Sequence, residues 1–464
     1  MNNLWRIIIA VFTICFLMAG PCFGLTIKEE KELGDKFILE MFAHLEIIDD
    51  PVICSYVDKV GRQVLKAVGD QPFEYHFYVV NEHVFNAFAG PGGHIFINSG
   101  LLAAMDTEDE LAGILAHEIA HVSSRHISEK IARQSKIQLA TLAGMLAGVF
   151  LGAMPLAVIS PAVGTSTVLA YSREDERQAD EVGIKYLSDA GYNAAGLLSG
   201  LKKIRKAQWF GPDDVPGYLM THPAVDERLS YLDTWLAVHP DQAKKRSEHR
   251  YKFNKIRART IALYGDKDHA LKQLGELVKI LPDDPYALYG LGLIQGRMNH
   301  NKKAITSLRR AIELRPFDLD ILIALGQAYL QNNRLKEAAR LFESAVKKNP
   351  EKALGQFYLG RVRLVQGNLP VAEKHLRKAL SLMPNNNKAL YFMGKVLGKE
   401  GKNAEAHFFL GLFNLRQQDK KNAVWHLNHA LELVKNDDVL EKRIKKELNL
   451  LTGQDKILIK TGTK

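Results

Sequence analysis

The chain has 464 residues, of which 47% are apolar and 25% are charged. This length allows two or three domains with ample cores, and the composition excludes a chain that is disordered throughout. The formal net charge of +10 indicates anionic surfaces or acidic partners, although a solvated, lysine-rich surface explains it more simply.

The N-terminal segment, residues 1–24, is predicted to be a secretory signal peptide. Arg6 precedes an apolar run at residues 7–18, and small residues and turn formers follow it. Acylation at Cys22 is the alternative, but Pro21 departs from the small residue that lipoprotein processing prefers. Cleavage leaves a single cysteine, so no intrachain disulfide can form. Export also makes nucleic acid an unexpected partner.

The next segment is predicted to form two helices and two strands. Residues 27–68 repeat apolar positions at helical spacing, with an interruption at the Asp-Asp-Pro sequence of residues 49–51. Residues 73–80 are rich in β-branched and aromatic side chains, which predicts a strand. A second strand, residues 94–98, is expected after the turn-forming Pro-Gly-Gly sequence at 91–93.

The second predicted strand directly precedes the most informative helix of the chain. If its edge is exposed, it can hold an extended peptide by main-chain hydrogen bonds, as a protease does when it reads backbone instead of side chains. The candidate substrate-edge residues are Asn86, His94, Ile95 and Phe96. A plain hairpin strand is the alternative, and the sequence alone leaves both open.

A helix is predicted to begin at Thr107, because Thr107 and Glu110 have the spacing of a capping box. This helix carries the sequence His-Glu-Ile-Ala-His, in which His117 and His121 are one turn apart and face the same way. Two neutral imidazoles at this spacing can bind one Zn²⁺, and Glu118 can accept a proton from a water molecule that the metal polarises. The pattern is therefore typical of a zinc hydrolase.

A zinc hydrolase needs a third ligand from the protein, and a second predicted helix offers one. Glu176 and Asp180 share a face of that helix; Glu176 fits the third ligand, and Asp180 fits an acceptor that fixes the tautomer of a ligand histidine. His126 is the rival, but Ser124 and Ile127 stand where the motif of that rival class requires glycine and histidine. His126 is therefore expected to be an exposed residue at a helix end.

Two further segments bear on the site. Residues 137–171 contain no charged residue. This segment is too short for two membrane spans, which need roughly 40 residues and a turn. We therefore expect it to form a lid or a pair of core-packed helices, and such helices could touch a membrane surface. Residues 206–220 are predicted to be a loop that delivers His222 and then a helix bearing Asp226, Glu227 and Arg228. His222 could be a fourth ligand, a donor to the transition state or a cap, and these stay open.

The C-terminal half contains a repeat. Pro282, Pro316, Pro350 and Pro384 fall 34 residues apart, which is the period of tetratricopeptide repeats. Four to five helix pairs and a capping helix near residues 438–450 are expected from this pattern, followed by a frayed tail at 451–464. Such a solenoid presents a concave surface that binds peptides or other proteins.

The motifs together resemble the CAAX prenyl protease and HtpX superfamily of zinc metallopeptidases. They are His-Glu-Ile-Ala-His at 117–121, Ser-Arg-x-x-Glu-x-x-Ala-Asp at 172–180, Asn86 to Gly93, and Thr-His-Pro at 221–223. With the signal peptide and the repeats, the chain is most similar to the periplasmic β-barrel assembly-enhancing protease group. The resemblance implies that His117, His121 and Glu176 bind one zinc ion per chain and that Glu118 is the catalytic base. It also favours the substrate-edge interpretation of the second strand.

The predicted fold is mainly α: an α+β, gluzincin-type metallopeptidase domain with a small sheet at 25–240, then an α-solenoid of repeats at 251–450. The resemblance implies an exported, periplasmic endopeptidase that degrades misassembled outer-membrane proteins and assists their assembly. Its expected partners are protein substrates and the outer-membrane β-barrel assembly machinery with its precursors, and it could contact a membrane peripherally. A repeat-based chaperone with a gated or vestigial metal site is the alternative. A membrane-embedded prenyl-type protease is disfavoured because multiple spans are lacking.

Overall fold

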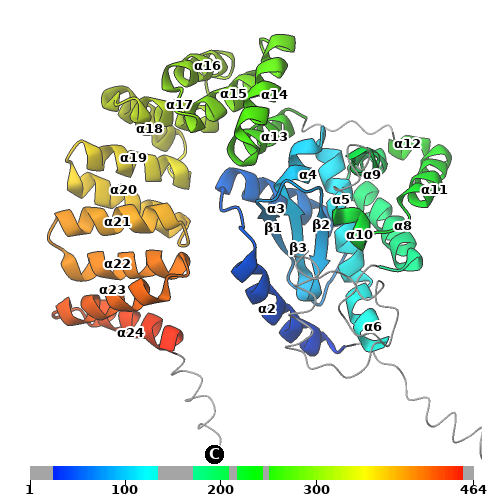
Figure 1. Cartoon of the computed structure of the whole chain (residues 1–464), viewed down its shortest axis with the longest axis horizontal. Coiled ribbons are helices and arrows are strands. Elements are labelled where there is room, and N and C mark those ends of the chain that lie inside the picture. The colour runs from blue at the N-terminus through cyan, green and yellow to red at the C-terminus, as the bar shows by residue number, and fades with distance from the viewer. Residues whose placement is uncertain (1–24, 134–170, 208–216, 244–249, 453–464) are drawn as a thin grey trace, which may run out of the picture. The chain divides into compact units, whose positions relative to one another are not determined.

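The computed structural model describes residues 25–133, 171–207, 217–243 and 250–452 (Figure 1). The predicted signal peptide falls outside these residues, and so do nearly all of the apolar segment 137–171 and residues 453–464 of the predicted tail. The chain divides into two compact units, one ending at Ala270 and the other beginning at Leu271. No helix in the described ranges has the length and apolar character needed to cross a membrane.

The first unit contains a small sheet. Its strands are β1 (His76–Val80), β2 (Ala87–Gly90) and β3 (His94–Asn98), in the order β1-β3-β2. β3 pairs in parallel with β1 and antiparallel with β2, so β2 and β3 form a hairpin closed by the short helix η1 (Pro91–Gly93). Gly92 has a φ of 76°, a left-handed conformation that glycine adopts without strain.

The predicted exposed edge at residues 94–98 is wrong. His94, Ile95 and Phe96 lie in β3, the central strand, whose main chain pairs with neighbours on both sides. The reason is that β1 and β2 both form their hydrogen-bond ladders with β3. The composition of a strand does not show which other strands it will pair with. Asn86 precedes β2, which ends the sheet on one side, and its carbonyl oxygen accepts a hydrogen bond from the N–H of Asn98 (2.9 Å).

The helices of the first unit include α5, which is buried along its length. They are α2 (Ile27–His44), α3 (Pro51–Leu65), α4 (Ser99–Ala104), α5 (Glu108–Ser123), α6 (His126–Arg133), α8 (Arg173–Asp189), α9 (Ala195–Ala207), α10 (Gly217–Thr221), α11 (Val225–Val238), α12 (Pro240–Ala243) and α13 (Arg250–Tyr264). α2 and α3 confirm the two helices predicted for residues 27–68. Every residue of α5 from Glu108 to Val122 is buried.

α5 begins as predicted, with a difference in its cap. The Thr107 hydroxyl accepts a hydrogen bond from the N–H of Glu110 (3.2 Å), which fixes the first turn. The reciprocal bond of a capping box is replaced: the Glu110 carboxylate accepts bonds from the Asp106 N–H and the Ser199 hydroxyl, each at 2.6 Å. The cap of α5 is thereby tied to α9.

Two glycines let neighbouring helices approach α5 closely. A Cβ at Gly113 of α5 would lie 2.6 Å from the backbone nitrogen of Leu197 in α9. A Cβ at Gly183 of α8 would lie 3.2 Å from the Cα of His117 in α5. Because α8 packs this tightly against α5, side chains of α8 reach the His117 face of α5.

The first unit extends beyond residue 250, where the repeats were predicted to begin. α13 packs against α3 and α4, and the guanidinium of Arg259 forms a buried ion pair with Asp50 at 2.7 Å. Asp50 also caps α3 by accepting a hydrogen bond from the N–H of Val52 at 3.0 Å. Removing α13 would leave Asp50 buried without this cation, so a truncation that preserves the first unit should end near residue 270.

The second unit is a stack of antiparallel helix pairs. Its helices are α14 (Lys267–Ile280), which spans the boundary, α15 (Pro285–Arg297), α16 (Asn301–Leu314), α17 (Leu319–Gln331), α18 (Leu335–Lys348), α19 (Ala353–Val365), α20 (Leu369–Leu382), α21 (Asn387–Lys399), α22 (Asn403–Arg416), α23 (Lys420–Leu433) and α24 (Asp438–Thr452). The pairs from α15 to α22 and the final helix α24 confirm the predicted repeats and capping helix. The fold is therefore mainly α with one small sheet.

The repeat signature has a direct packing cause. A Cβ at Gly326 of α17 would lie 2.5 Å from Cε1 of Phe342 in the paired helix α18, so only glycine allows the large ring to fill the space between the helices. The same relation joins four further pairs: Gly292 with Leu308, Gly360 with Leu376, Gly394 with Leu410, and Gly411 with Leu427.

Candidate metal centre

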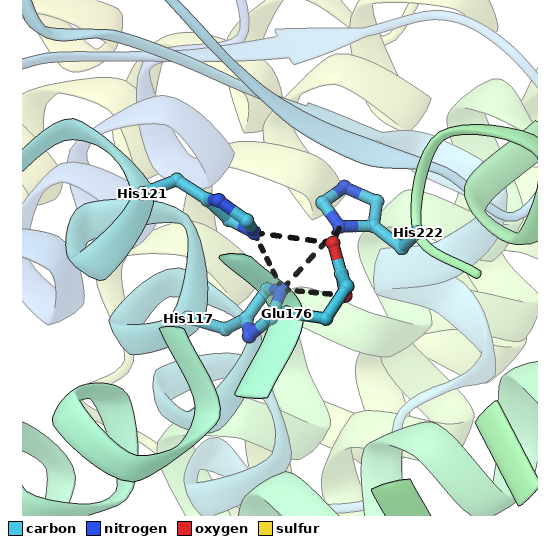
Figure 2. Close-up of side chains that lie close together, drawn as sticks. All are labelled: His117, His121, Glu176 and His222. Carbon is cyan, nitrogen blue, oxygen red and sulfur yellow. Dashed lines mark hydrogen bonds and ion pairs between the residues drawn. The ribbon is translucent and has the colours of Figure 1, made fainter. Parts of the chain in front are cut away.

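Four buried side chains from three parts of the first unit converge on one point (Figure 2). α5 supplies His117 and His121, α8 supplies Glu176, and His222 directly follows α10. One potential ligand atom from each lies within 4.8 Å of the others. The Nε2 atoms of His117 and His121 are 3.0 Å apart, and the Nδ1 atom of His222 is 2.9 Å from Oε1 of Glu176.

This donor set fits a transition metal ion. Imidazole nitrogens and a carboxylate oxygen are the ligands that Zn²⁺ takes in hydrolases, and they bind it in their neutral and ionised forms respectively. Burial lowers the pKa of His121 well below its ordinary value, so this imidazole is neutral at pH 7. Burial acts to raise the pKa of Glu176, but the charges of Arg228 and His222 and the hydrogen bonds with His121 and His222 together outweigh it and hold the pKa well below the ordinary value. The group could therefore hold a metal.

Glu118 lies beside this group and is itself fully buried. Within the described part of the chain, neither of its carboxylate oxygens has a hydrogen-bond partner. Its Oε1 atom is 3.6 Å from Nε2 of His222. Burial raises the pKa of Glu118. A buried carboxyl without partners is costly to retain, which is typical of a group that acts on a bound reactant.

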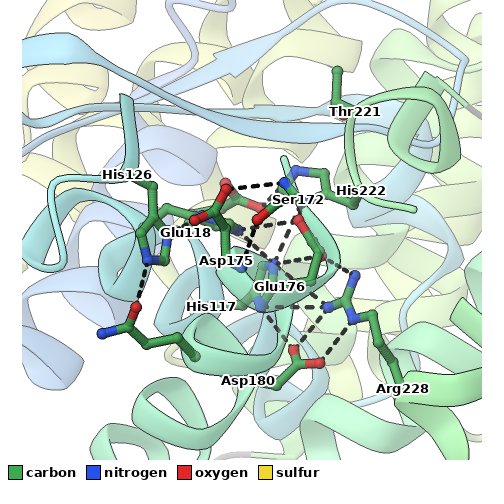
Figure 3. Close-up of polar contacts among 12 residues, drawn as sticks. His117, Glu118, His126, Ser172, Asp175, Glu176, Asp180, Thr221, His222 and Arg228 are labelled. Carbon is green, nitrogen blue, oxygen red and sulfur yellow. Dashed lines mark hydrogen bonds and ion pairs between the residues drawn. The ribbon is translucent and has the colours of Figure 1, made fainter. Parts of the chain in front are cut away.

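Asp180 makes the contact predicted for it. Its Oδ1 atom lies 2.8 Å from Nδ1 of His117, so the proton of that imidazole is held at Nδ1 and Nε2 is left with its lone pair toward Glu176 and His121 (Figure 3). Asp180 and Glu176 are one turn apart on α8, which follows from the helical period.

Arg228 of α11 is a member of the site that the sequence analysis did not assign. It is fully buried, with its Nη1 atom 2.5 Å from Oε2 of Glu176 and its Nε atom 2.7 Å from Oδ2 of Asp180 (Figure 3). The guanidinium thus joins the two carboxylates, and its Nη2 atom also lies 3.4 Å from both ring nitrogens of His117. The hydroxyl of Tyr231, one turn further along α11, also donates to Asp180. The only sequence signal was an arginine six residues after His222.

His126 is not the exposed helix-end residue that was predicted. Its side chain is buried, with Nδ1 2.8 Å from Nδ1 of His121 and Nε2 3.1 Å from Oε1 of Gln178. The reason is a chain reversal: α5 ends at Ser123, and Arg125 adopts a left-handed φ of 57°. Residue 126 therefore folds back toward His121, where a continued helix would have carried it away.

Backbone hydrogen bonds fix the segment that carries His222. The N–H of Tyr218 donates to the Phe85 carbonyl (3.3 Å), and the N–H of Tyr171 donates to the Thr221 carbonyl (3.0 Å). Residues 217–221 form the short helix α10, so the last part of the predicted 206–220 loop is helical instead; residues 208–216 lie outside the described ranges.

Aromatic rings enclose the imidazoles. Tyr171 stacks on His121 with ring centroids 3.7 Å apart, and Tyr218 stacks on His222 at 4.2 Å. Burial acts to lower the pKa of His222, but the carboxylates of Glu176 and Glu118 outweigh it and raise the pKa. The rings keep bulk water from the imidazoles and fix their planes.

The comparisons with known proteins agree with this geometry. Residues 54–236 match peptidase family M48, and residues 289–346 and 323–387 match a tetratricopeptide repeat family. The β-barrel assembly-enhancing protease of Yersinia pestis is 30% identical over 53% of this chain and 51% of its own length. The Escherichia coli K12 protein of the same name is 28% identical over 44% of this chain and 43% of its own length. The mitochondrial metalloendopeptidase OMA1 of Schizosaccharomyces pombe is 29% identical over 39% of this chain and 52% of its own length.

The chain spans about half the length of the curated relatives it matches. Among solved structures, one described as the crystal structure of MamA is similar over 34% of this chain and 92% of that chain, with 22% identity and a TM-score of 0.30. That score is too low to support any argument about function.

Proposed function

The chain carries a peptidase family M48 domain followed by tetratricopeptide repeats, and on this premise we propose that it is a zinc-dependent endopeptidase. The observation that carries the proposal is the buried group of His117, His121 and Glu176 with the unpartnered carboxyl of Glu118 beside it. The names of the relatives, which are metalloendopeptidases and assembly-enhancing proteases, support the same activity.

In the proposed mechanism, His117, His121 and Glu176 hold the metal. A bound Zn²⁺ supplies Lewis acidity, which polarises the scissile carbonyl and lowers the pKa of water. Asp180 keeps the proton of His117 on Nδ1, and Arg228 balances the charge of the two carboxylates.

Glu118 performs the proton transfers in this mechanism. It accepts the proton of the attacking water and delivers it to the leaving amine nitrogen as the peptide bond breaks. A group with free lone pairs and a raised pKa suits both steps, because it must first take a proton and then release it.

His222 is proposed to hold the site in a latent state. Its Nδ1 atom lies within the ligand group, 3.4 Å from Nε2 of His117 and 2.9 Å from Oε1 of Glu176, which suits a fourth ligand that takes the place of water. A latent protease spares folded proteins until the segment after α10 moves. This arrangement also favours the gated form of the alternative, a repeat-based chaperone whose protease activity is switched on only by clients.

Replacing His222 by alanine tests latency. The latent interpretation predicts a severalfold rise in cleavage of an unfolded generic substrate, because a coordination position opens to water. A loss of activity would assign His222 to stabilising the transition state instead. If both the cleavage rate and the spectrum of a Co²⁺-substituted protein stay unchanged, His222 has neither role. Replacing His239, which stacks on Trp235 away from the ligand group, provides a control.

We further propose that the protease acts in the periplasm, on misassembled outer-membrane proteins, and that the repeats recruit them and the β-barrel assembly machinery. Two relatives are named for enhancing β-barrel assembly, and every ligand candidate lies in the first unit while the repeats form the second. A substrate held by the repeats is kept at high effective concentration near the protease.

A truncated chain of residues 25–270 separates the two activities. It should keep cleavage of an unfolded generic substrate and lose association with barrel precursors, because the proposed binding surface is absent. The boundary at 270 retains the buried pair of Asp50 and Arg259. Pull-down of radiolabelled precursors and a fluorogenic cleavage assay measure the two effects. A truncated protein that still recovers the same precursors would refute the division of labour.

A further inference from the structure

Two helices of the second unit carry cationic residues and no acidic ones. α19 contains Arg361 and Arg363, and α21 contains Lys388, Lys395 and Lys399; neither sequence includes aspartate or glutamate. The two helices contact each other although they belong to consecutive repeats. Within the residues that the structure describes, only Arg363 has a carboxylate partner, Glu343 on the second helix of the preceding pair, so four cations remain on adjoining helices.

Arg361 is the least expected of these cations. Its guanidinium carbon lies 4.5 Å from the ring centroid of Phe392 and 5.7 Å from those of Phe357 and Tyr358. The side chain is partly buried among these rings, and burial lowers its pKa. No carboxylate pairs with it anywhere in the ranges that the structure describes. A guanidinium withdrawn from water without a counter-ion costs free energy that cation–π contacts offset only in part.

The acidic groups of the same repeats are already paired elsewhere. Glu373 binds Lys402 at 2.6 Å and Arg377 at 2.7 Å, and Glu405 binds Arg377 at 2.5 Å; these four residues lie on or beside the second helices α20 and α22. Glu400, which directly follows α21, binds Lys402 at 2.9 Å, and Glu351 binds Lys378 at 2.7 Å. A carboxylate for Arg361 must therefore come from another molecule or from a segment outside these repeats.

The exposed residues around Arg361 suit a peptide. The Tyr391 ring is 36% exposed and has the ammonium of Lys395 5.5 Å from its centroid, and Phe392 is partly buried beside it. Where aromatic rings lie next to cations, one or two residues of an extended, bound peptide can make both an apolar contact and a charge contact. The planar fork of arginine binds a carboxylate through two parallel hydrogen bonds.

We propose that this basic aromatic surface, formed by Arg361, Lys388, Tyr391, Phe392, Lys395 and Lys399, binds an acidic segment of another polypeptide. The Arg361 fork takes one carboxylate, and the lysines of α21 attract the flanking ones. A flat phosphate surface such as a membrane fits less well, because the guanidinium lies among rings and not on a protruding side chain. This inference deepens the proposal that the repeats recruit partners and rests on it.

The test measures peptide binding directly. The full chain with Glu118→Gln, which prevents cleavage, is titrated into a fluorescein-labelled peptide that alternates glutamate with aromatic residues, and anisotropy is recorded at two salt concentrations. Arg361→Gln should raise Kd by about tenfold or more and reduce the salt dependence. Arg310→Gln is the control, because Arg310 is exposed on α16 and already paired with Asp283; its Kd should stay within about twofold.

A second measurement separates binding from a structural role. Because Arg361 is an unpaired, partly buried charge, Arg361→Gln should leave Tm unchanged or raise it. A lower Tm together with unchanged peptide affinity would make Arg361 a packing residue and overturn the inference. Equal binding of a peptide with glutamine in place of glutamate would also overturn it, and so would stronger Arg361-dependent binding to phosphatidylglycerol vesicles. None of these outcomes depends on proteolysis, so cleavage by the wild-type chain tests the proposed function independently.

Discussion

The Glu118→Gln protein is expected to hydrolyse unfolded substrates about two to four orders of magnitude more slowly than the wild-type protein. Glutamine has nearly the same shape and can occupy the same buried position, but it cannot accept a proton from water. The carboxylate of Glu118 has no hydrogen-bond partner among the described residues, so the exchange breaks no hydrogen bond and alters only the contact with His222 at 3.6 Å. The loss should appear in kcat, because the proton moves in the transition state.

Zinc content distinguishes loss of the base from loss of the metal. Atomic absorption should give one zinc per chain in both proteins, because the predicted ligands His117, His121 and Glu176 are unchanged. Glu181→Gln is the matched control: Glu181 is exposed on α8 and, among the described residues, forms an ion pair with Arg177 alone, at 3.4 Å. Undiminished cleavage by purified Glu118→Gln protein, free of contaminating proteases, would remove Glu118 from the mechanism.

Helical periodicity explains why much of the centre could be predicted. Within one helix, the sequence spacing fixes the relative directions of side chains, so the His117 and His121 pair and the Glu176 and Asp180 pair could be found without a structure. The repeat period worked for the same reason, since each 34-residue unit packs against the next in the same way. Neither the helical period nor the repeat period predicts how α5 and α8 pack against each other. Their packing depends on the close approach at Gly183.

The errors fall where tertiary contacts or single backbone angles decide the outcome. His126 was assigned to the surface because Ser124 and Ile127 depart from the motif in which it would be a ligand, and the left-handed turn at Arg125 that buries it has no periodic signal. The strand at residues 94–98 was assigned an edge because strand order depends on nonlocal pairing. Arg228 was predicted only as a polar residue of a helix. Its ion-pair partners, Glu176 and Asp180, lie on α8, about fifty residues earlier in the chain, so no local pattern identifies them. A fully buried arginine is rare enough that only its partners explain it.

Replacing Arg228 by leucine is expected to have the second largest effect. The substitution leaves Glu176 and Asp180 buried without the cation that joins them, and breaking a buried ion pair from one side costs about 3–5 kcal/mol. Urea unfolding of the metal-free protein should show this loss in the free energy of unfolding. Zinc affinity, measured by competition with a chromophoric chelator, should fall about 10- to 100-fold, because Glu176 and His117 lose the contacts that orient them.

Two companion variants make the Arg228 result specific. Arg205→Leu removes an arginine whose ion pair with Asp226 is exposed to solvent, so it should cost at most about 1 kcal/mol and leave zinc affinity unchanged. Arg228→Lys keeps the positive charge but cannot bind Glu176 and Asp180 at once through a planar fork, so it should fall between leucine and wild type in both measurements. If Arg228→Leu matches Arg205→Leu in stability and in zinc affinity, the guanidinium neither balances the carboxylates nor positions the centre. Metal binding would then have to tolerate Glu176 in more than one orientation.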